Sequence, residues 1–491
     1  MTTPSLLLNS QRIHDRLFQL PRERRLNLLA LTSLIFFTTC GGAFGLEPLI
    51  GAVGPGWAMV LIVVTPFVWS LPAALMAAEL TALLPEEGGY YVWVREAFGS
   101  FCAVQQACWT MIVSVVWLAM FPVLFVGYFG FFFPALEPPP TSPHASIAAF
   151  VRWILAVLFI AFGVALNLRG AREVGNSAKV SAYFVLLSFA LLMMVWLKFG
   201  SAPSSLFDFV KRDLTSSHKG VVLLGLSYVI FNTSGWENAS TYAGEVDEPQ
   251  RNYPRALGFA LLVLMLCYLL PVIAGVSTTS DPAIWSSDAG WPVIAQSIGG
   301  RWLGGLLAVA GLVSTLGLFN AQLLYVSRLP LVLAHDGWFP RFLGKASPGT
   351  AVPRAALLSF AAITALFASL SFGSLAIIQC LLYAGSLTFE FLALLILRLR
   401  CPDARRSFRV PCGWLGMGYV CVTPFAFAIV VLFATLHDWR SFRGQLFAVG
   451  IVLVSGVVLY FVRRKIALQL RNERVVESCA NSASCGGRRA E

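Results

Sequence analysis

The chain has 491 residues, of which 57% are hydrophobic and only 12% are charged. Soluble domains carry about 25% charged residues, so this composition excludes a soluble enzyme, a disordered chain and a disulfide-stabilised secreted scaffold. The net charge of +11 does not indicate nucleic-acid binding, because the Lys and Arg residues lie in short loops and tails, as orientation in a bilayer requires. The apolar runs exceed about 20 residues, which is too long for barrel strands of about 10 residues. The sequence therefore predicts an all-α integral membrane protein.

Twelve apolar segments, each long enough to cross a bilayer, follow one another with short connections. A cytoplasmic segment at 1–26 precedes them, and a basic cytoplasmic tail at 463–491, expected to be disordered, follows them. The predicted spans are 27–53, 56–84, 98–134, 147–168, 174–199, 220–243, 255–276, 301–330, 353–371, 374–398, 414–437 and 444–462.

The distribution of positive charge predicts the orientation. With twelve spans, one side of the membrane holds 27 of the 35 Lys and Arg residues, together with both termini. The positive-inside rule places that side in the cytoplasm. We therefore expect a multi-pass protein of the cell membrane with both termini inside.

Two of the predicted spans are interrupted by residues that suit a continuous membrane helix poorly. Span 1 contains Gly-Gly-Ala-Phe-Gly at 41–45, followed by Glu47, and span 6 contains Asn-Thr-Ser-Gly-Trp-Glu-Asn at 232–238. A charged side chain inside the bilayer is costly, whereas an unwound segment that lines a cavity is tolerated. Paired breaks in corresponding places of two halves are typical of secondary transporters with a site at the membrane midplane. A Gly cluster that only packs helices closely is the alternative for span 1 alone.

Three stretches of the chain resemble the amino acid–polyamine–organocation superfamily. They are AELTALLPEEGGYYVWVREAFG at 78–99, STYAGEVDEPQRNYPRAL at 240–257 and FRVP at 408–411. The plant-type polyamine uptake branch is the most similar, through GGAFGLE at 41–47, PFVWSLPAAL at 66–75, PVLF at 122–125, and Tyr383 followed by Glu390.

This resemblance implies a five-plus-five inverted-repeat (LeuT-like) bundle with helices 1 and 6 broken, which works by alternating access. The first repeat would be spans 1–5 at 27–199 and the second spans 6–10 at 200–398, with spans 11–12 at 399–462 outside both. The substrate would lie between spans 1, 3, 6, 8 and 10.

The chain departs from the family pattern at three places. Trp117 stands where the plant-type branch has an acid in span 3, and Ala43 stands where that branch often has Pro. Ser188 stands where some relatives carry a Lys that substitutes for a sodium ion. The coupling ion, a proton or sodium, therefore stays open.

The residues around the breaks are the expected substrate site. Glu47, in the first turn of the outer half-helix, either caps the helix dipole or favours an ammonium group over a carboxylate; Glu237 has the same two interpretations. Trp236 either packs in the core or offers a cation–π face. The expected substrate-binding residues are Gly41, Gly42, Ala43, Phe44, Gly45, Glu47, Trp117, Asn232, Thr233, Ser234, Trp236, Glu237 and Tyr383.

Two further acids, Glu79 in span 2 and Glu390 in span 10, lie within predicted spans. Acids inside the membrane are functional by default, and a protonated acid that is hydrogen-bonded within the bundle is the structural alternative. The expected ion-coupling candidates are Glu79, Ser188, Ser314, Thr315 and Glu390.

The sequence offers no set of residues for catalysis. All five His residues lie in loops or at span ends, and there is no CxxC pair, metal-ligand cluster or phosphate-binding Gly loop. We expect a secondary active carrier for amino acids, polyamines or related organic amines, without a cofactor, a metal or a nucleic-acid partner. A nutrient sensor or channel on the same fold is the alternative, and an intramembrane enzyme is least expected. The sequence leaves the oligomeric state open.

Overall fold

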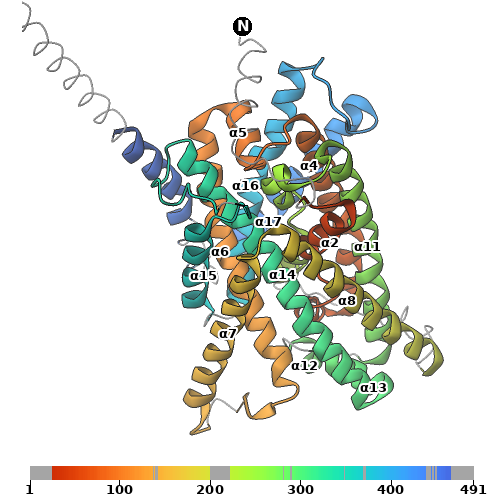
Figure 1. Cartoon of the computed structure of the whole chain (residues 1–491). Coiled ribbons are helices and arrows are strands. Elements are labelled where there is room, and N and C mark those ends of the chain that lie inside the picture. The colour runs from red at the N-terminus through yellow and green to blue at the C-terminus, as the bar shows by residue number, and fades with distance from the viewer. Residues whose placement is uncertain are drawn as a thin grey trace, which may run out of the picture.

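The computed structural model describes residues 25–136, 138, 142–199, 222–279, 281–287, 290–347, 349–368, 372–437, 444, 447 and 450–465 (Figure 1). Every regular element in these ranges is a helix, and one isolated bridge joins Leu26 to Val246. The predicted loop at 200–219 and the outer parts of both tails lie outside the described residues.

The helices follow the predicted spans in order, with residues 450–465 forming a further, unlabelled helix. They are α2 (Leu28–Thr39), α3 (Glu47–Thr65), η2 (Pro66–Ser70), α4 (Leu71–Leu83), α5 (Tyr90–Phe98), α6 (Ser100–Gly130), η3 (Pro134–Leu136), α7 (Ala145–Asn167), α8 (Ala171–Phe199), α10 (Val222–Thr233), η4 (Asn238–Glu245), α11 (Pro249–Thr278), α12 (Pro282–Trp285), α13 (Gly290–Gly299), α14 (Arg301–His335), α15 (Arg354–Phe367), α16 (Phe372–Arg400) and α17 (Gly413–His437).

Eight helical stretches of the described chain are long and apolar enough to cross a membrane, and α2 and α15 are shorter apolar helices. Many large side chains on their outer faces, such as Phe162, Leu197 and Leu366, are exposed. Exposed apolar surface of this extent marks contact with a membrane or with other proteins, and on long apolar helices it fits contact with lipid. The predicted all-α, multi-pass membrane protein is therefore confirmed, while twelve separate spans and the two inverted repeats remain predictions.

The long helical stretch Glu47–Leu83 divides at Gly54. Gly54 has φ 78° and ψ 163° and is followed by Pro55, so the helix stops and restarts at this point. The division matches the predicted boundary between spans 1 and 2. The second part contains a single π-helical turn, η2, a distortion often found at functional sites.

Both predicted interruptions are present. α2 ends at Thr39 and α3 begins at Glu47, and the glycines between them at 41, 42 and 45 have φ of 65°, 98° and 86°. α10 ends at Thr233 and η4 begins at Asn238, with Gly235 at φ 102° between them. These left-handed angles are accessible to Gly at little cost, which explains why the chain unwinds there.

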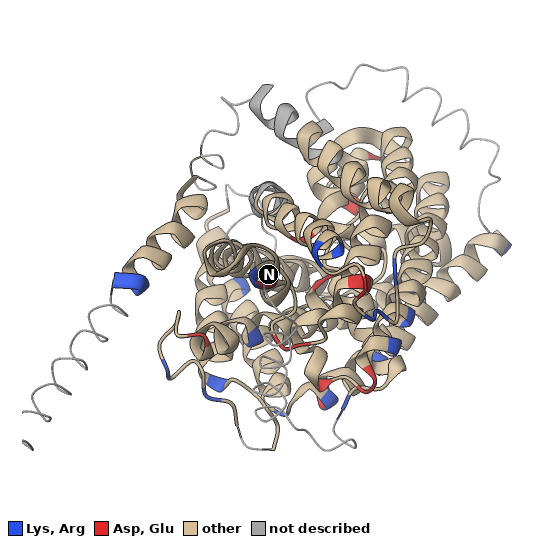
Figure 2. Ribbon diagram, turned by 90° about the horizontal axis from the view of Figure 1, so that it is seen from above, with Lys and Arg blue, Asp and Glu red and all other residues tan. Residues whose placement is uncertain are grey.

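The broken helices lie within a bundle whose longest member is α14. α14 packs against α2, α6, α8 and α13, and α10 packs against α3 and α16. Figure 1 shows α2 lying between α11 and the central helices. In the view from above, Lys and Arg lie mostly in loops and at helix ends toward the rim (Figure 2). Several acids, among them Glu47, Glu237 and Glu390, are buried inside the bundle.

The structure contains helices that the sequence analysis missed. α5 is a separate helix before span 3, set off by Gly99 with φ 87°. α12 and α13 lie in the connection between spans 7 and 8. α13 carries Trp291, which reaches the first break, as described below.

Candidate functional site

The two breaks lie against each other and are joined by side-chain hydrogen bonds. The Asn232 amide nitrogen donates to the Gly45 carbonyl oxygen over 2.9 Å. The Trp69 indole nitrogen donates to the Ser234 hydroxyl over 3.0 Å, and the Ser70 hydroxyl donates to the Thr233 carbonyl over 3.0 Å. η2, which carries Trp69 and Ser70, therefore holds the second break in place.

The carbonyl groups released by the unwinding already accept hydrogen bonds from side chains. The Ser314 hydroxyl donates to the Gly41 carbonyl, and the Tyr268 hydroxyl donates to the Asn232 carbonyl. The Trp291 indole nitrogen donates to the Ala43 carbonyl over 2.7 Å. A buried carbonyl without a partner is costly, so these donors stabilise the unwound shape of both segments.

A small cavity of about 10 Å³ lies between the breaks. A volume of this size holds about one water molecule, so the structure shows the site closed around its centre. Four of the lining side chains are aromatic, contributed by the first break, α6 and α10. The lining residues are Thr38, Thr39, Cys40, Phe44, Trp117, Phe121, Leu124, Phe231, Asn232 and Leu318.

Glu237 lies behind this aromatic wall. The Tyr383 hydroxyl donates to the Glu237 carboxylate over 2.7 Å and accepts from the Gly235 N–H over 2.8 Å. The Tyr383 ring contacts Trp117 with a centroid distance of 5.5 Å. Tyr383 thus connects a side chain of the cavity wall to a buried acid, and it brings together three predicted site residues from α6, α16 and the second break.

Glu47 is buried at the start of α3, where three donors surround its carboxylate. Gly45 N–H donates to it over 2.7 Å, the Tyr128 hydroxyl over 2.8 Å and Trp291 N–H over 3.4 Å. Helix N-termini attract anions, and here a carboxylate of the protein itself takes that place. This geometry matches the capping interpretation of Glu47.

Trp236 and Thr315 bond within their own segments. The Trp236 indole nitrogen donates to the Thr233 carbonyl over 2.9 Å, and the Thr315 hydroxyl donates to the Leu312 carbonyl over 3.0 Å. Neither lines the central cavity. Of the other expected coupling residues, Ser314 reaches the first break, whereas the Ser188 hydroxyl donates to Phe184 of its own helix over 2.8 Å.

Glu390 belongs to a polar layer between α6 and α16. The Gln106 amide nitrogen donates to the Glu390 carboxylate over 2.9 Å, and the hydroxyls of Thr110 and Ser386 lie 2.6 Å apart. The second Glu390 carboxylate oxygen is buried without a hydrogen-bond partner in the described structure. This leaves Glu390 able to bind a proton or a cation inside the bundle.

Glu79 lies in a different environment, at the end of α4. Its carboxylate accepts from Val410 N–H over 2.7 Å and lies 3.5 Å from both Arg398 and Arg406. These contacts tie α4 to the FRVP segment and to the end of α16. The arrangement suits a structural role in joining these elements.

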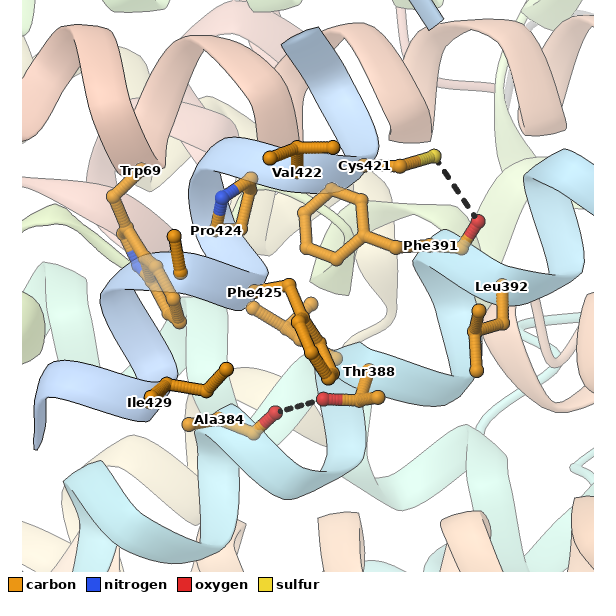
Figure 3. Close-up of a pocket in the computed structure, with 12 residues that line it drawn as sticks. Trp69, Ala384, Thr388, Phe391, Leu392, Cys421, Val422, Pro424, Phe425 and Ile429 are labelled. Carbon is orange, nitrogen blue, oxygen red and sulfur yellow. Dashed lines mark hydrogen bonds between the residues drawn. The ribbon is translucent and has the colours of Figure 1, made fainter. Parts of the chain in front are cut away.

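A second cavity of about 310 Å³ opens on the outside of the bundle between η2, α16 and α17 (Figure 3). Its few polar atoms are already bonded, since Thr388 donates to Ala384 over 2.9 Å and Cys421 to Phe391 over 3.8 Å. Trp69 forms one wall of this cavity. The cavity is lined mainly by aromatic and aliphatic side chains, with no acid among its lining residues, and of the two breaks' neighbours it shares only Trp69.

Sequence reasoning missed several residues of the site, namely Phe121, Phe231, Tyr128, Tyr268, Gln106 and Trp291. Phe231 directly precedes the polar run at 232–238, and this position could have identified it as a site residue. Trp291 gave no such signal, because it lies in the connection between spans 7 and 8 and reaches the first break only through the fold.

Comparison with known proteins identifies the family. Residues 26–456 match the amino acid permease family model. A probable polyamine transporter of Arabidopsis thaliana is 33% identical over 441 residues, covering 89% of this chain and 86% of the relative. A polyamine transporter of Oryza sativa subsp. japonica is 34% identical over 445 residues, covering 90% and 80%.

A branched-chain amino acid permease of Bacillus subtilis is 25% identical over 457 residues, covering 90% of this chain and 93% of the relative. The matches extend over nearly the whole chain, so they confirm the resemblance found in the sequence, including its similarity to the plant polyamine branch. The chain belongs to the amino acid permease family and is a membrane transporter of amino acids or polyamines, not an enzyme.

Proposed function

We propose that this protein is a secondary carrier for small organic cations, with a monoamine or a short diamine such as putrescine as substrate. It works by alternating access in a five-plus-five inverted-repeat bundle, driven by an ion gradient or by exchange. The repeats are 27–199 and 200–398, and residues 399–462 lie outside them.

The observation that carries this proposal is the aromatic lining of the central cavity. Phe44, Trp117, Phe121 and Phe231 line the cavity, and no Lys or Arg does. A cation over an aromatic face gains about 0.5–2 kcal/mol, with the higher values where water is excluded. Glu237 adds a negative charge behind Trp117 and Tyr383.

The cap formed by Glu47 argues against a substrate with a carboxylate. In amino-acid carriers with this fold, the start of the outer half-helix is expected to receive the substrate carboxylate. Here the Glu47 carboxylate already accepts the Gly45 N–H over 2.7 Å. A second carboxylate would lose these donors and meet a like charge in a low-dielectric interior, where repulsion is strong.

The closed cavity supports a cycle in which the site opens to one side at a time. A volume of about 10 Å³ is too small for a diamine, so substrate entry requires the walls to move apart. Phe44 belongs to the first break, and Phe231 lies in the last turn of α10, just before the second break. Movement of either half of a broken helix would therefore enlarge the cavity from one end.

Charge asymmetry supports the orientation that we propose. With the twelve predicted spans, 27 of the 35 Lys and Arg residues fall on the side that carries the termini. This side faces the cytoplasm by the positive-inside rule. The Leu26 N–H donates to the Glu245 carbonyl, and the Asp247 N–H donates to the Leu26 carbonyl, so the N-terminal segment and η4 lie at the same end of the bundle. We propose that this end faces the cytoplasm.

Uptake by proteoliposomes tests the proposal. Purified protein would be offered labelled putrescine, spermidine, arginine and leucine, with and without an inward proton gradient. We expect putrescine to accumulate at least about tenfold faster than leucine, equivalent to about 1.4 kcal/mol of discrimination. Protein-free vesicles give the background. Accumulation of leucine alone would show that the site selects neutral amino acids.

A further inference from the structure

The cytoplasmic end of the site is closed by direct backbone contact. The loop at 84–89 lies against η4, where Gly88 N–H donates to the Thr241 carbonyl over 3.0 Å. A side chain at Gly89 would collide with Ser240. Substrate therefore cannot leave toward the cytoplasm until this loop separates from η4.

Three charged side chains are buried at this contact. Arg328, from α14, lies 2.9 Å from the Glu245 carboxylate at the end of η4, and both side chains are at most 2% exposed. Glu87, from the 84–89 loop, is 3% exposed, and neither of its carboxylate oxygens has a hydrogen-bond partner in the described structure. Its oxygen packs onto Gly244, where an added Cβ would lie only 3.0 Å away.

The surroundings of Glu87 disfavour its ionised form. Burial raises the pKa of Glu87, and the nearby Glu245 carboxylate raises it further, while Arg328 lowers it. Arg328 is already bonded to Glu245, so its charge is shared. An ionised Glu87 would therefore be a buried carboxylate without a hydrogen-bonded cation of its own, which is costly.

Further charged groups lie on the far side of Glu245, where Arg169, Arg172 and Glu173 line a cavity together with it. Tyr242 of η4 lies beside the same ion pair, and its phenol is neutral in the physiological range. Glu86, the neighbour of Glu87 in its own loop, is 7% exposed and has an interaction partner. The charged groups of the described chain that act on Glu87 across the contact are thus Glu245 and Arg328.

We propose that the Glu87 carboxyl is a proton-binding site that must be protonated for the cytoplasmic end of the carrier to close. When the 84–89 loop moves away from η4, Glu87 reaches water and gives its proton to the cytoplasm. When the loop returns, Glu87 takes a proton from the same side. The inference deepens the proposed carrier function and rests on the proposed orientation.

The sign of the resulting pH dependence follows from linkage. The pKa of Glu87 is raised in the closed state and returns to the ordinary carboxyl range in the open state. Protonation therefore stabilises the closed state at low pH, and this stabilisation is lost as the pH rises through the closed-state pKa. An alkaline cytoplasm favours the open state, and an acidic one retains the closed state.

A buried cysteine reports on this closure without needing a substrate. Ser327 is fully buried beside Arg328, so a Ser327→Cys variant in a Cys-free background reacts with maleimide only when this end opens. Labelling would be measured in proteoliposomes between about pH 6 and about pH 8, with a Glu87→Gln version of the same protein as reference. The reference protein carries the same introduced thiol. The effect of pH on the ionisation of that thiol is therefore the same in both proteins and cancels in the ratio of their labelling rates.

We expect the labelling rate, relative to the Glu87→Gln protein, to rise at least about threefold over this range. Glu96→Gln, which removes a partly exposed carboxylate paired with Arg95, should leave the pH dependence unchanged. Glu245→Gln provides a second test, because Arg328 would then pair with Glu87 and favour its ionised form. The midpoint of the pH dependence of labelling should shift to lower pH.

A pH profile that is the same with and without the Glu87 carboxyl would overturn the inference, as would an unmoved midpoint in Glu245→Gln. Putrescine uptake in the same vesicles separates the two proposals. If uptake is present and the labelling profile is unchanged, only the role of Glu87 is wrong. If putrescine is not taken up at any pH, the proposed carrier function is wrong, whatever the labelling shows.

Discussion

Replacing Gly235 by Ala is expected to reduce transport by about 100-fold or more, with the protein still inserted in the membrane. Gly235 has φ 102°, a conformation that costs other residues about 1–3 kcal/mol. An added Cβ would also collide with the Thr38 carbonyl oxygen in the last turn of α2, next to the first break. Backbone cannot move aside as a flexible side chain does, so the two breaks would separate and the cavity would lose its shape.

Initial rates of putrescine uptake, normalised to the amount of protein in the vesicles, measure this effect. Gly258→Ala is the matched control, because Gly258 lies within α11 and has no atom within 4 Å of an added Cβ. The control should transport as well as the unmodified protein. Normal uptake by Gly235→Ala would mean that the contact between the breaks is not needed for transport.

Glu237→Gln is expected to slow putrescine uptake at least about tenfold, which corresponds to about 1.4 kcal/mol. Gln retains the size of Glu and can still accept the hydrogen bond from Tyr383, so the change removes mainly the negative charge. That charge lies behind the cavity wall in a dry interior, where it attracts an ammonium group strongly. The effect should appear in uptake rates across a range of putrescine concentrations.

Glu173→Gln serves as the control for this variant. Glu173 lies exposed in the first turn of α8, so the same loss of one charge should leave uptake unchanged. If Glu237→Gln transports putrescine normally while Gly235→Ala does not, Glu237 has a structural role at the start of η4. The selection of cations would then have to come from the aromatic rings alone.

The positions of the two breaks could be predicted from the sequence because their residues conflict with a membrane helix. The three glycines at 41, 42 and 45 and the polar run at 232–238 have no stable continuous-helix form in lipid. The residue types within each segment were sufficient to predict where the two helices break. The division between spans 1 and 2 was likewise marked by Gly54 and Pro55.

The partners of the site residues could not be predicted, because they depend on contacts between distant segments. The donors around Glu47 include Tyr128, from α6, and Trp291, from α13, which lie 81 and 244 residues away along the chain. The sequence left both the capping and the substrate-binding interpretations of Glu47 open. Only the packing of α6 and α13 around the first break favours capping.

The surroundings of Glu79 illustrate the same limit. The sequence marks Glu79 as an acid inside a predicted span, and such acids are functional by default. Its partners Arg398, Arg406 and Val410 come from the far end of the chain. Short helices such as α5 were also missed, because nine residues between two glycines give too little periodicity to separate them from the following span.

Protection of Cys40 by substrate tests most directly whether the cavity between the breaks holds an organic cation. Cys40 lines this cavity and is 3% exposed, so in a variant lacking the other nine cysteines a small thiol reagent reaches it only while the site is open. We predict that saturating putrescine slows the modification of Cys40 at least about tenfold, and that leucine does not. Protection by leucine and not by putrescine would contradict the account.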